Sequence, residues 1–392
     1  MAMAADILIV GGGSTGASIA YHLAAARAGQ ITLLERATLA SGTTGQSSAI
    51  IRQHYSIPTL ARMAQRSLHT FRHFAEELGR DAGFRQTGLL IGARAEDAEG
   101  LRTTVAMHRE LGIDSRMIDR DALHELEPRM VTDDLVGACY EPEAGYADPV
   151  ATTMAYAHAA RQLGAQIRQH TRVSSLLVEG DRVRGVLLED GTQVETRTVI
   201  VASNVWGIKL LADAGISVPV RSTRHACILL QQPRDFGQQH AIIFDFASGL
   251  YLRPEGENLT MAGTLDESEA ETVDPEHYNA LPTHDEEERF AMRTAERFPA
   301  MGDATLQAGW AGLYDVSDDW QPLIGPFPGV EGLFCALGFS GHGYKLCPAI
   351  GTLVAEILLG RASPGIDRAI FSPDRFAMGA QAQSTYAFGI IG

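Results

Sequence analysis

The sequence predicts an α/β fold of mixed (α+β) character, and three segments carry this prediction. At residues 6–10 a short apolar run, the length of a strand buried on both faces, meets a glycine-rich turn and an alanine-rich amphipathic stretch. Residues 173–201 alternate apolar and polar side chains between turn residues, which is typical of a β-meander. Residues 332–360 repeat the order of apolar run, glycine loop and helical pattern at the far end of the chain.

Composition limits the number of domains and the possible partners. The 392 residues suggest roughly two to three domains, and 45% hydrophobic residues suffice for a large core. A net charge of −16 argues against nucleic acid or an anionic membrane as partner. We expect no membrane insertion, because no segment reaches spanning length and the chain opens on a strand without a targeting segment. Scattered cysteines without a C-x-x-C spacing predict free buried thiols in a reducing cytoplasm and no metal site: Cys139, Cys227, Cys335 and Cys347.

The N-terminal turn has the G-x-G-x-x-G spacing of a dinucleotide-binding loop. One glycine permits the tight turn, one lets a pyrophosphate approach the backbone, and one allows the helix to pack closely on the strand. The following helix, residues 17–26, offers free N–H groups and a positive dipole end to phosphates. Glu35 ends a second predicted strand, at about the distance expected of a carboxylate that binds a ribose. We therefore predict a dinucleotide site that includes Gly11, Gly13, Ser14, Thr15, Gly16 and Glu35.

A loop rich in glycine and hydroxyl groups follows this unit and leads to an arginine. Its N–H and hydroxyl groups could surround a pyrophosphate, although an ordinary surface turn is the alternative. Arg52 comes next, beside the apolar pair Ile50-Ile51. It is either a surface arginine with a buried stem or a fixed receptor for a carboxylate. The loop residues that we assign to the cofactor are Ser41, Thr44, Gly45, Ser47 and Ser48.

The middle of the chain predicts alternating helices and strands. Pro58 opens a helix that runs to Leu78, and two charged helices are expected within residues 95–130. Asp148 is the predicted N-cap of a further helix. The meander then consists of strands at 173–178, 183–188 and 194–201. The segment 219–310 is rich in alternating strands and is predicted to form a separate substrate domain that contains a β-sheet. A β-meander inserted between parallel strands is not a feature of nicotinamide-dependent dehydrogenases with the plain doubly wound fold, so it argues against that class of enzyme.

The C-terminal unit places Lys345 in the first turn of its helix. A cation there opposes the helix dipole, and Lys345 is one of only two lysines, the other being Lys209. A lysine whose stem lies along a helix is the structural alternative. The helix N-terminus could face an electron-rich atom that gathers negative charge during a reaction.

Together these residues resemble the FAD-dependent D-amino acid oxidase superfamily, and most of all its sarcosine oxidase, dimethylglycine dehydrogenase and glycine oxidase branch. The resemblance rests on Gly11–Gly16 with Glu35, on the segment from Thr44 to Arg52, and on Gly338–Lys345. It implies a glutathione-reductase-like FAD-binding domain (1–82, 146–218 and 311–392) interleaved with a substrate domain built on a large mixed β-sheet (83–145 and 219–310).

The same resemblance implies roles for individual residues. Arg52 and Lys345 correspond to the residues that clamp a substrate carboxylate, and Val173 to a backbone contact with the adenine. Residues 341–344 correspond to the loop that lies along the flavin. With these we assign to the cofactor site Arg36, Ala202, Ser203, Trp206, Gly341, His342, Gly343, Tyr344 and Lys345.

Three departures from the family pattern bear on the chemistry. Gly312 and Ala147 stand where relatives carry a cysteine and a histidine that attach flavin, so we expect non-covalent FAD. Residues 249–263 contain no lysine to activate O₂, and Arg253 is the only cation there. We therefore expect the reduced protein to react slowly with O₂.

The predicted reaction is hydride transfer from a small carboxylate-bearing amine to flavin, giving an imine that water hydrolyses. We expect Tyr314 and Tyr251 to form the wall of the substrate pocket, with His342 singled out by its loop. The rivals are a nicotinamide-dependent dehydrogenase, a tRNA-modifying relative, and an FAD-bearing subunit of an amino acid or opine dehydrogenase that passes electrons to a protein partner. Sarcosine, dimethylglycine, a D-amino acid, proline and an opine all remain possible substrates. The electron acceptor is O₂ or another molecule. The chain could also form a homo-oligomer.

Overall fold

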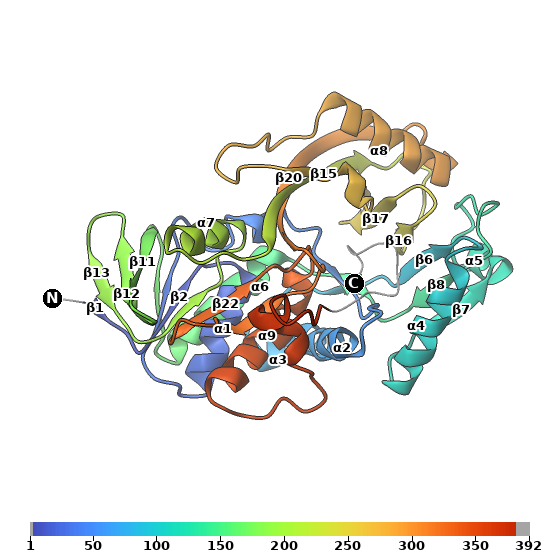
Figure 1. Cartoon of the computed structure of the whole chain (residues 1–392). Helices are drawn as coiled ribbons and strands as arrows, with labels where there is room; N and C mark the ends of the chain where they lie inside the picture. Colours follow the sequence, from blue (N-terminus) through green and yellow to red (C-terminus); the bar gives the residue numbers. More distant parts are fainter. Residues whose placement is uncertain (1–2, 382–392) are drawn as a thin grey trace.

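The computed structural model describes residues 3–381, which are arranged around two large β-sheets (Figure 1). The first sheet has six strands in the order β10-β3-β2-β14-β22-β21. All neighbouring strands in it are parallel except the pair β21 and β22. Its strands are β2 (Ile7–Val10), β3 (Ile31–Leu34), β10 (Gln166–Arg168), β14 (Val199–Val201), β21 (Leu323–Pro326) and β22 (Leu333–Leu337).

Both faces of the six-stranded sheet are buried, which explains the unbroken apolar runs of its strands. Alternate residues of β2 enter different cores: Ile7 and Ile9 face the helices, whereas Leu8 and Val10 face the meander. One face is covered by α1 (Ser14–Ala25), α6 (Pro149–Gln162) and α9 (Gly343–Leu358), with α2 (Pro58–Arg72) and α3 (Phe74–Leu78) packed beyond them. The opposite face is covered by α7 (Val205–Asp213) and a four-stranded sheet made of β1 (Met3–Ala4), β11 (Val173–Glu179), β12 (Arg182–Leu188) and β13 (Gln193–Glu195).

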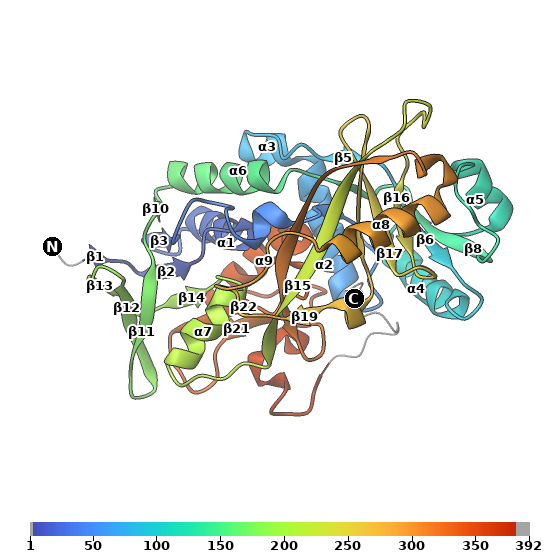
Figure 2. The ribbon, with the colours of Figure 1, turned by 90° about the horizontal axis from the view of Figure 1, so that it is seen from above.

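The second large sheet has nine strands and is mixed. Its long hairpin-like pair, β15 (Val220–Gln231) and β20 (Thr305–Ser317), is antiparallel over its whole length and crosses the molecule in Figure 2. The other strands are β6 (Leu89–Ala93), β7 (Arg116–Asp119), β8 (Gly137–Glu141), β16 (Ile242–Asp245), β17 (Leu250–Glu255), β18 (Leu259–Thr264) and β19 (Glu271–Thr272). One face is covered by α8 (His284–Arg297) and α5 (Arg120–Leu126), and α4 (Ala98–Glu110) packs on the other.

A small three-stranded sheet links the two large ones. It pairs β4 (Ile50–Ile51) and β5 (Arg85–Gln86) with the central strand β9 (Gly145–Tyr146). Ile50 belongs to the same apolar cluster as Tyr251 and Phe244 of the nine-stranded sheet. The chain leaves β4 directly into Arg52, so this junction sets the position of that residue.

Most predicted elements are confirmed, and two are wrong in detail. Asp148 accepts hydrogen bonds from the N–H groups of Val150 and Ala151 (2.8 and 2.9 Å), so it is the N-cap of α6. The single strand expected at 194–201 is two strands: β13 belongs to the meander, and β14 enters the parallel sheet beside β2. The helix expected from Pro58 to Leu78 is interrupted at His73, which separates α2 from α3. The predicted division into two domains is consistent with the two sheets but stays a prediction.

Candidate functional site

A cavity of about 1170 Å³ opens at the carboxyl ends of β2, β3 and β14. It continues past the end of β20 and the loop before α9, and a segment at residues 272–278 borders it from the nine-stranded sheet. Ligands of α/β proteins bind outside this edge of a parallel sheet. The predicted residues that line the cavity are Gly11, Gly13, Ser14, Thr15, Glu35, Arg36, Ser41, Thr44, Ser47, Val173, Ala202, Ser203, Trp206, Tyr314, Gly341, Gly343 and Tyr344.

The glycine-rich turn has the geometry that its sequence demands. Gly11 has a φ of +114°, and a Cβ there would lie 2.5 Å from the carbonyl oxygen of Ala202. A Cβ at Gly16 would lie 2.0 Å from the carbonyl oxygen of Gly11, so no side chain fits between the turn and α1. Ser14 and Thr15, the first residues of α1, face the cavity. The backbone N–H groups there can bind a pyrophosphate.

Glu35 is joined to this turn by hydrogen bonds. Its carboxylate accepts from the N–H of Gly12 (2.7 Å, Oε2) and from the N–H of Ala37 (2.8 Å, Oε1). The side chain therefore fixes the glycine turn and borders the cavity at the same time. Thr44 has a similar double position, since its hydroxyl accepts from the N–H of Ser14 (3.2 Å) while the residue lines the cavity.

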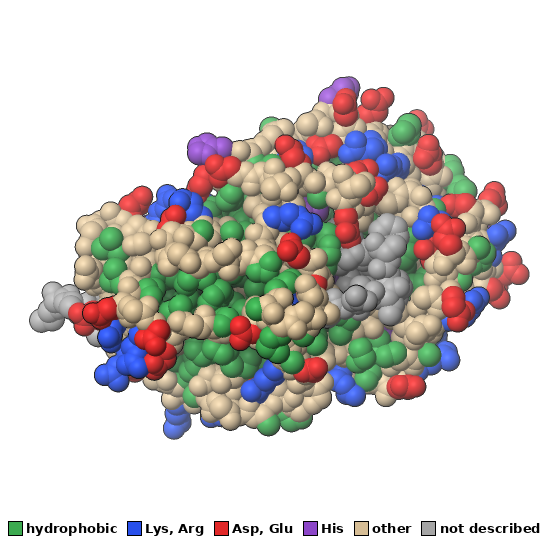
Figure 3. Space-filling model, viewed as in Figure 1, with side chains coloured by type: hydrophobic (Ala, Val, Ile, Leu, Met, Phe, Trp, Pro, Cys, Tyr) green, Lys and Arg blue, Asp and Glu red, His purple; other side chains and the backbone are tan. Residues whose placement is uncertain are grey.

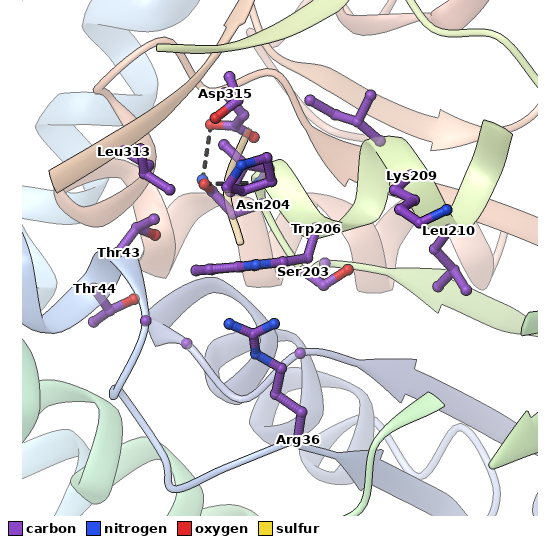
Figure 4. A pocket seen from close by; sticks show the side chains of 18 of the residues that line it. Arg36, Thr43, Thr44, Ser203, Asn204, Trp206, Lys209, Leu210, Leu313 and Asp315 are labelled. Carbon is purple, nitrogen blue, oxygen red and sulfur yellow. Dashed lines mark hydrogen bonds between the residues drawn. The ribbon is translucent and has the colours of Figure 1, made fainter. Parts of the chain in front are cut away.

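Arg36 and Trp206 form one wall of the cavity. The Arg36 guanidinium lies 4.1 Å from the centre of the Trp206 ring, and Figure 4 shows it against the face of the ring, which is seen edge-on. Arg36 also forms an ion pair with Glu276 (2.7 Å), which in turn lies 3.5 Å from Arg172. The segment around Glu276 was not predicted to belong to the site, because it is an exposed stretch of the chain without a recognisable pattern.

Arg52 and Lys345 lie close to each other and are buried, at 2% and 9% exposure. Lys345 Nζ donates to the carbonyl oxygen of Gly341 (3.0 Å), and Arg52 Nη1 donates to the carbonyl oxygen of His54. Burial lowers the pKa of Lys345 well below its usual value, and the positive charge of Arg52 adds to the shift. Arg52 Nε is buried without a hydrogen-bond partner. The structure thus buries an arginine and a lysine together, and an anion between them would favour the charged form of the lysine.

Not every predicted residue borders the large cavity. Arg52 and Lys345 do not line it, although Lys345 follows the lining residue Tyr344 and its Nζ contacts the carbonyl oxygen of Gly341, which also lines it. The other predicted residues outside the lining are Gly16, Gly45, Ser48, Tyr251, Arg253 and His342. The cofactor region and the residues expected to hold the substrate are therefore adjacent but separate.

Tyr314 lies on β20 and Tyr251 on β17, both strands of the nine-stranded sheet. The ring of Tyr314 stacks on that of His225, with 3.9 Å between ring centres, and burial raises the pKa of Tyr314 to about 12. Burial also lowers the pKa of His225 to about 3, so both groups are neutral at pH 7. Gly341, with a φ of +83°, packs on Tyr314, since a Cβ there would lie 2.7 Å from the ring. These side chains make a neutral, aromatic boundary beside the glycine loop.

The remaining two candidates have defined partners. Arg253 forms an ion pair with Glu255 (2.5 Å) and lies over the ring of Tyr146, so its charge is already compensated. His342 precedes the first turn of α9, and its Nδ1 lies 3.3 Å from the hydroxyl of Tyr55.

Asp315 and Asn204 are site residues that sequence reasoning missed. The Asp315 carboxyl accepts from Asn204 Nδ2 (2.8 Å) and from the N–H of Gly338 (2.7 Å), and the first of these contacts is the dashed line in Figure 4. Burial raises the pKa of Asp315 to about 7. The only local signal in the sequence was an acidic residue directly after Tyr314, near the end of the same strand. Its partners could not be foreseen, because they come from the turn between β14 and α7 and from the loop before α9.

Several known proteins are similar to this chain. The chain is 28% identical to glycine oxidase of Geobacillus kaustophilus over 94% of its length and 97% of that protein. It is also 28% identical to 4-methylaminobutanoate oxidase (formaldehyde-forming) of Paenarthrobacter nicotinovorans, again over 94% of its length, but it spans only 45% of that relative. The crystal structure of L-proline dehydrogenase from P. horikoshii superposes with a TM-score of 0.88 at 27% identity, covering 97% of this chain and all of that one.

The family itself is matched along most of the chain. Residues 6–357 fit the DAO family of FAD-dependent oxidoreductases, which confirms the expected fold, the class of enzyme and the cofactor. In the described part of the chain no helix is both long and apolar enough to cross a membrane. The glycine turn, the cavity and the match together establish that the chain belongs to the DAO family of FAD-dependent oxidoreductases.

Proposed function

We propose that this flavoenzyme oxidises the C–N bond of a small amino acid whose carboxylate is held by Arg52 and Lys345. The observation that carries the proposal is the pair of neighbouring buried cations behind the glycine loop of α9. Among the described residues neither of them has a carboxylate within ion-pair distance, although the charge of Arg52 acts on the buried carboxyl of Glu141. Two cations so placed repel each other, and a substrate carboxylate between them would relieve the repulsion.

FAD fits the large cavity. The N-terminus of α1, the glycines of the turn and the Arg36–Trp206 wall suit the pyrophosphate, ribose and adenine of a dinucleotide. When bound, the flavin supplies the hydride acceptor of the reaction. Gly312, in β20, packs against Gln46 and offers no side-chain atom for a covalent link, so we propose that the cofactor is held non-covalently.

The protein's contribution would be orientation and exclusion of water. Arg52 can grip one carboxylate edge with two parallel N–H groups, and Lys345 can add a second cation, which together fix the pose of the substrate. The neutral boundary of Tyr314 and Tyr251 would favour an uncharged amine, which is the form that can give up its electron pair. Both tyrosines keep their protons at pH 7, because burial raises their pKa values.

The relatives suggest the class of substrate. Their names include oxidation or dehydrogenation of glycine, a methylamino acid and proline, all small amino acids with a carboxylate. The chain also spans less than half of some relatives, and since one of these is named a dehydrogenase, transfer of electrons to a protein partner is the second candidate. A cytoplasmic location, consistent with four free buried cysteines, is part of the same proposal.

The test is an anaerobic screen of flavin bleaching. N-methyl amino acids, D-amino acids, glycine and proline are added to the purified protein, each paired with the amine that lacks the carboxyl group. We expect at least one amino acid to bleach the flavin while its matched amine does not. Equal bleaching by the matched amine would contradict the role of Arg52 and Lys345. Bleaching by a reduced nicotinamide dinucleotide, and by none of the amino acids, would contradict the proposed reaction.

A further inference from the structure

Arg52 differs from the other buried arginines in how its charge is held. Charged side chains are spread over the surface of the molecule, as Figure 3 shows for one face, whereas Arg52 is buried. Among the described residues Arg52 has no carboxylate within ion-pair distance, and Glu141 acts on it only from further away. The other buried arginines are each paired with a carboxylate: Arg224 with Glu286, Arg253 with Glu255, Arg297 with Asp245 and Arg375 with Asp319.

The ring of Tyr55 lies where those arginines have a carboxylate. Arg52 Cζ is 4.5 Å from the centre of the Tyr55 ring and 5.7 Å from the centre of the Phe244 ring. Nη1 of Arg52 donates to the carbonyl oxygen of His54. A guanidinium over an aromatic face is attracted by the quadrupole of the ring, most strongly where water is excluded. The ring stabilises the positive charge without neutralising it, so the charge stays available to an anionic ligand.

The backbone around Tyr55 is fixed by two other elements of the fold. His108 of α4 has its Nε2 3.0 Å from the carbonyl oxygen of Tyr55. Glu141 of β8 accepts from the N–H of Gln53 (3.0 Å), and its Oε1 lies 3.4 Å from Nδ1 of His54. Burial lowers the pKa of His54 to about 3 and that of His108 to about 4, so both rings are neutral at pH 7. The turn after β4 is therefore held in place without a further positive charge beside Arg52.

The hydroxyl of Tyr55 reaches the other half of the proposed substrate site. It lies 3.3 Å from Nδ1 of His342, and the two ring centres are 5.3 Å apart. Burial raises the pKa of Tyr55 to about 12, so the hydroxyl keeps its proton at pH 7. His342 directly precedes α9, whose first turn carries Lys345. One fully buried side chain thus contacts Arg52 with its ring and the start of α9 with its hydroxyl.

We propose that Tyr55 is a positioning residue that couples Arg52 to the glycine loop before α9. The inference rests on the proposed function, in which Arg52 and Lys345 bind the substrate carboxylate. The ring orients the guanidinium for a two-pronged contact with the carboxylate, and the hydroxyl keeps the loop at a constant distance from it. A misplacement of about 1 Å can cost about a hundredfold in rate, so this link would set the substrate correctly against the flavin.

Nothing in the sequence marks Tyr55 for this role. A tyrosine after a buried strand is an ordinary core residue, and Tyr55 does belong to the large apolar cluster beneath the parallel sheet. Its hydroxyl contact comes from a residue 287 positions later in the chain. A core residue alone would affect stability, whereas a positioning residue affects affinity and rate separately, and the experiments use this difference.

Two substitutions separate the ring from the hydroxyl. Tyr55→Leu removes the ring below Arg52, so the Kd of the flavin-loaded protein for acetate, measured by calorimetry, should rise about 5- to 30-fold. Tyr55→Phe keeps the ring and should bind acetate within about twofold of the parent. The matched control is Tyr156→Phe, a change at a buried tyrosine of α6 that packs on Tyr21 and Phe74, and it should bind like the parent. An unchanged Kd in folded Tyr55→Leu would overturn the proposal.

A double-variant cycle shows whether Tyr55 acts through Arg52. In the Arg52→Ala background, Tyr55→Leu should change the Kd for acetate by less than about twofold. Additive losses would overturn the coupling, because a general structural defect lowers affinity in either background. Arg52→Ala alone tests the proposed function, which fails if this variant binds acetate like the parent. The coupling fails if Arg52→Ala is impaired and Tyr55→Leu is not.

The hydroxyl contact is tested by rate. With an amino acid that bleaches the flavin, Tyr55→Phe should lower the limiting rate of flavin reduction about tenfold while the Kd for that substrate stays near the parent value. Tyr55→Phe combined with His342→Ala should be no slower than His342→Ala, since both changes remove the same contact. Should Tyr55→Leu fail to fold, these rates decide. A limiting rate of Tyr55→Phe equal to that of the parent would overturn the link to the loop.

Discussion

Replacing Lys345 by methionine tests the carboxylate clamp with little change of shape. In the structure Nζ makes one hydrogen bond, to Gly341, so two of its three N–H donors are available to a ligand. A charge pair about 4 Å apart in a partly shielded interior is worth about 4 kcal/mol. Truncating one partner of such a pair costs about 2–5 kcal/mol. At 1.4 kcal/mol for each factor of ten, the Kd for a carboxylate should rise about 30- to 4000-fold.

The assay follows the flavin spectrum while acetate or another carboxylate without an amine is added at constant ionic strength. Lys209→Met is the matched control, because Lys209 is the chain's other lysine and is exposed in an ion pair with Asp213. It should bind the carboxylate like the parent protein. If Lys345→Met and Lys209→Met bound it equally well, with normal flavin content, the clamp would be refuted.

Four further outcomes are expected. Arg52→Lys should recover only part of the carboxylate affinity lost in Arg52→Ala, because the two-pronged geometry is missing; full recovery in the same titration would show that charge alone matters. The pKa of Lys345 is lowered in the free protein, and a bound carboxylate raises it again. The affinity for the carboxylate should therefore fall about tenfold per pH unit above the pKa of Lys345 in the free protein, and binding there should take up one proton. An affinity that does not change with pH would contradict this. Acid precipitation should leave the yellow colour in the supernatant, whereas colour in the pellet would mean a covalent link. Because the charge of Arg253 is paired with Glu255, turnover with a dye should exceed turnover with air. Stopped-flow reoxidation of the reduced protein by O₂ at a rate far above that of free reduced flavin would contradict this. Loss of that fast rate in Arg253→Met would then identify Arg253 as the cation that promotes the reaction with O₂.

The sequence was most informative where backbone geometry dictates residue type. The glycines of the first turn were predictable because Gly11 needs a positive φ and Gly16 has no space for a Cβ. Asp148 was predictable as an N-cap because proline follows it at the first position of α6. The apolar runs of β2 and β3 indicated strands buried on both faces, and both strands lie within the parallel sheet.

Features that depend on distant segments were not predictable in the same way. Nothing local distinguishes β13 from β14, because their separation follows from pairing with β12 in one case and with β2 and β22 in the other. Glu276 enters the site through Arg36, some 240 residues earlier in the chain. Asp315 likewise acquires its partners from two other segments. Arg52 and Lys345 could be nominated by resemblance, but their proximity and burial became visible only in the fold.

The central claim is that an amino acid held by Arg52 and Lys345 transfers a hydride from the carbon of its C–N bond to the flavin and becomes an imine, which water hydrolyses. Its most direct test is an anaerobic single turnover with the best substrate from the bleaching screen, in which the products are counted. The account predicts one equivalent of oxo compound and one of released amine for each flavin reduced, and neither product from Lys345→Met at the same substrate concentration. Flavin reduction without these products, or equal yields from the two proteins, would contradict it.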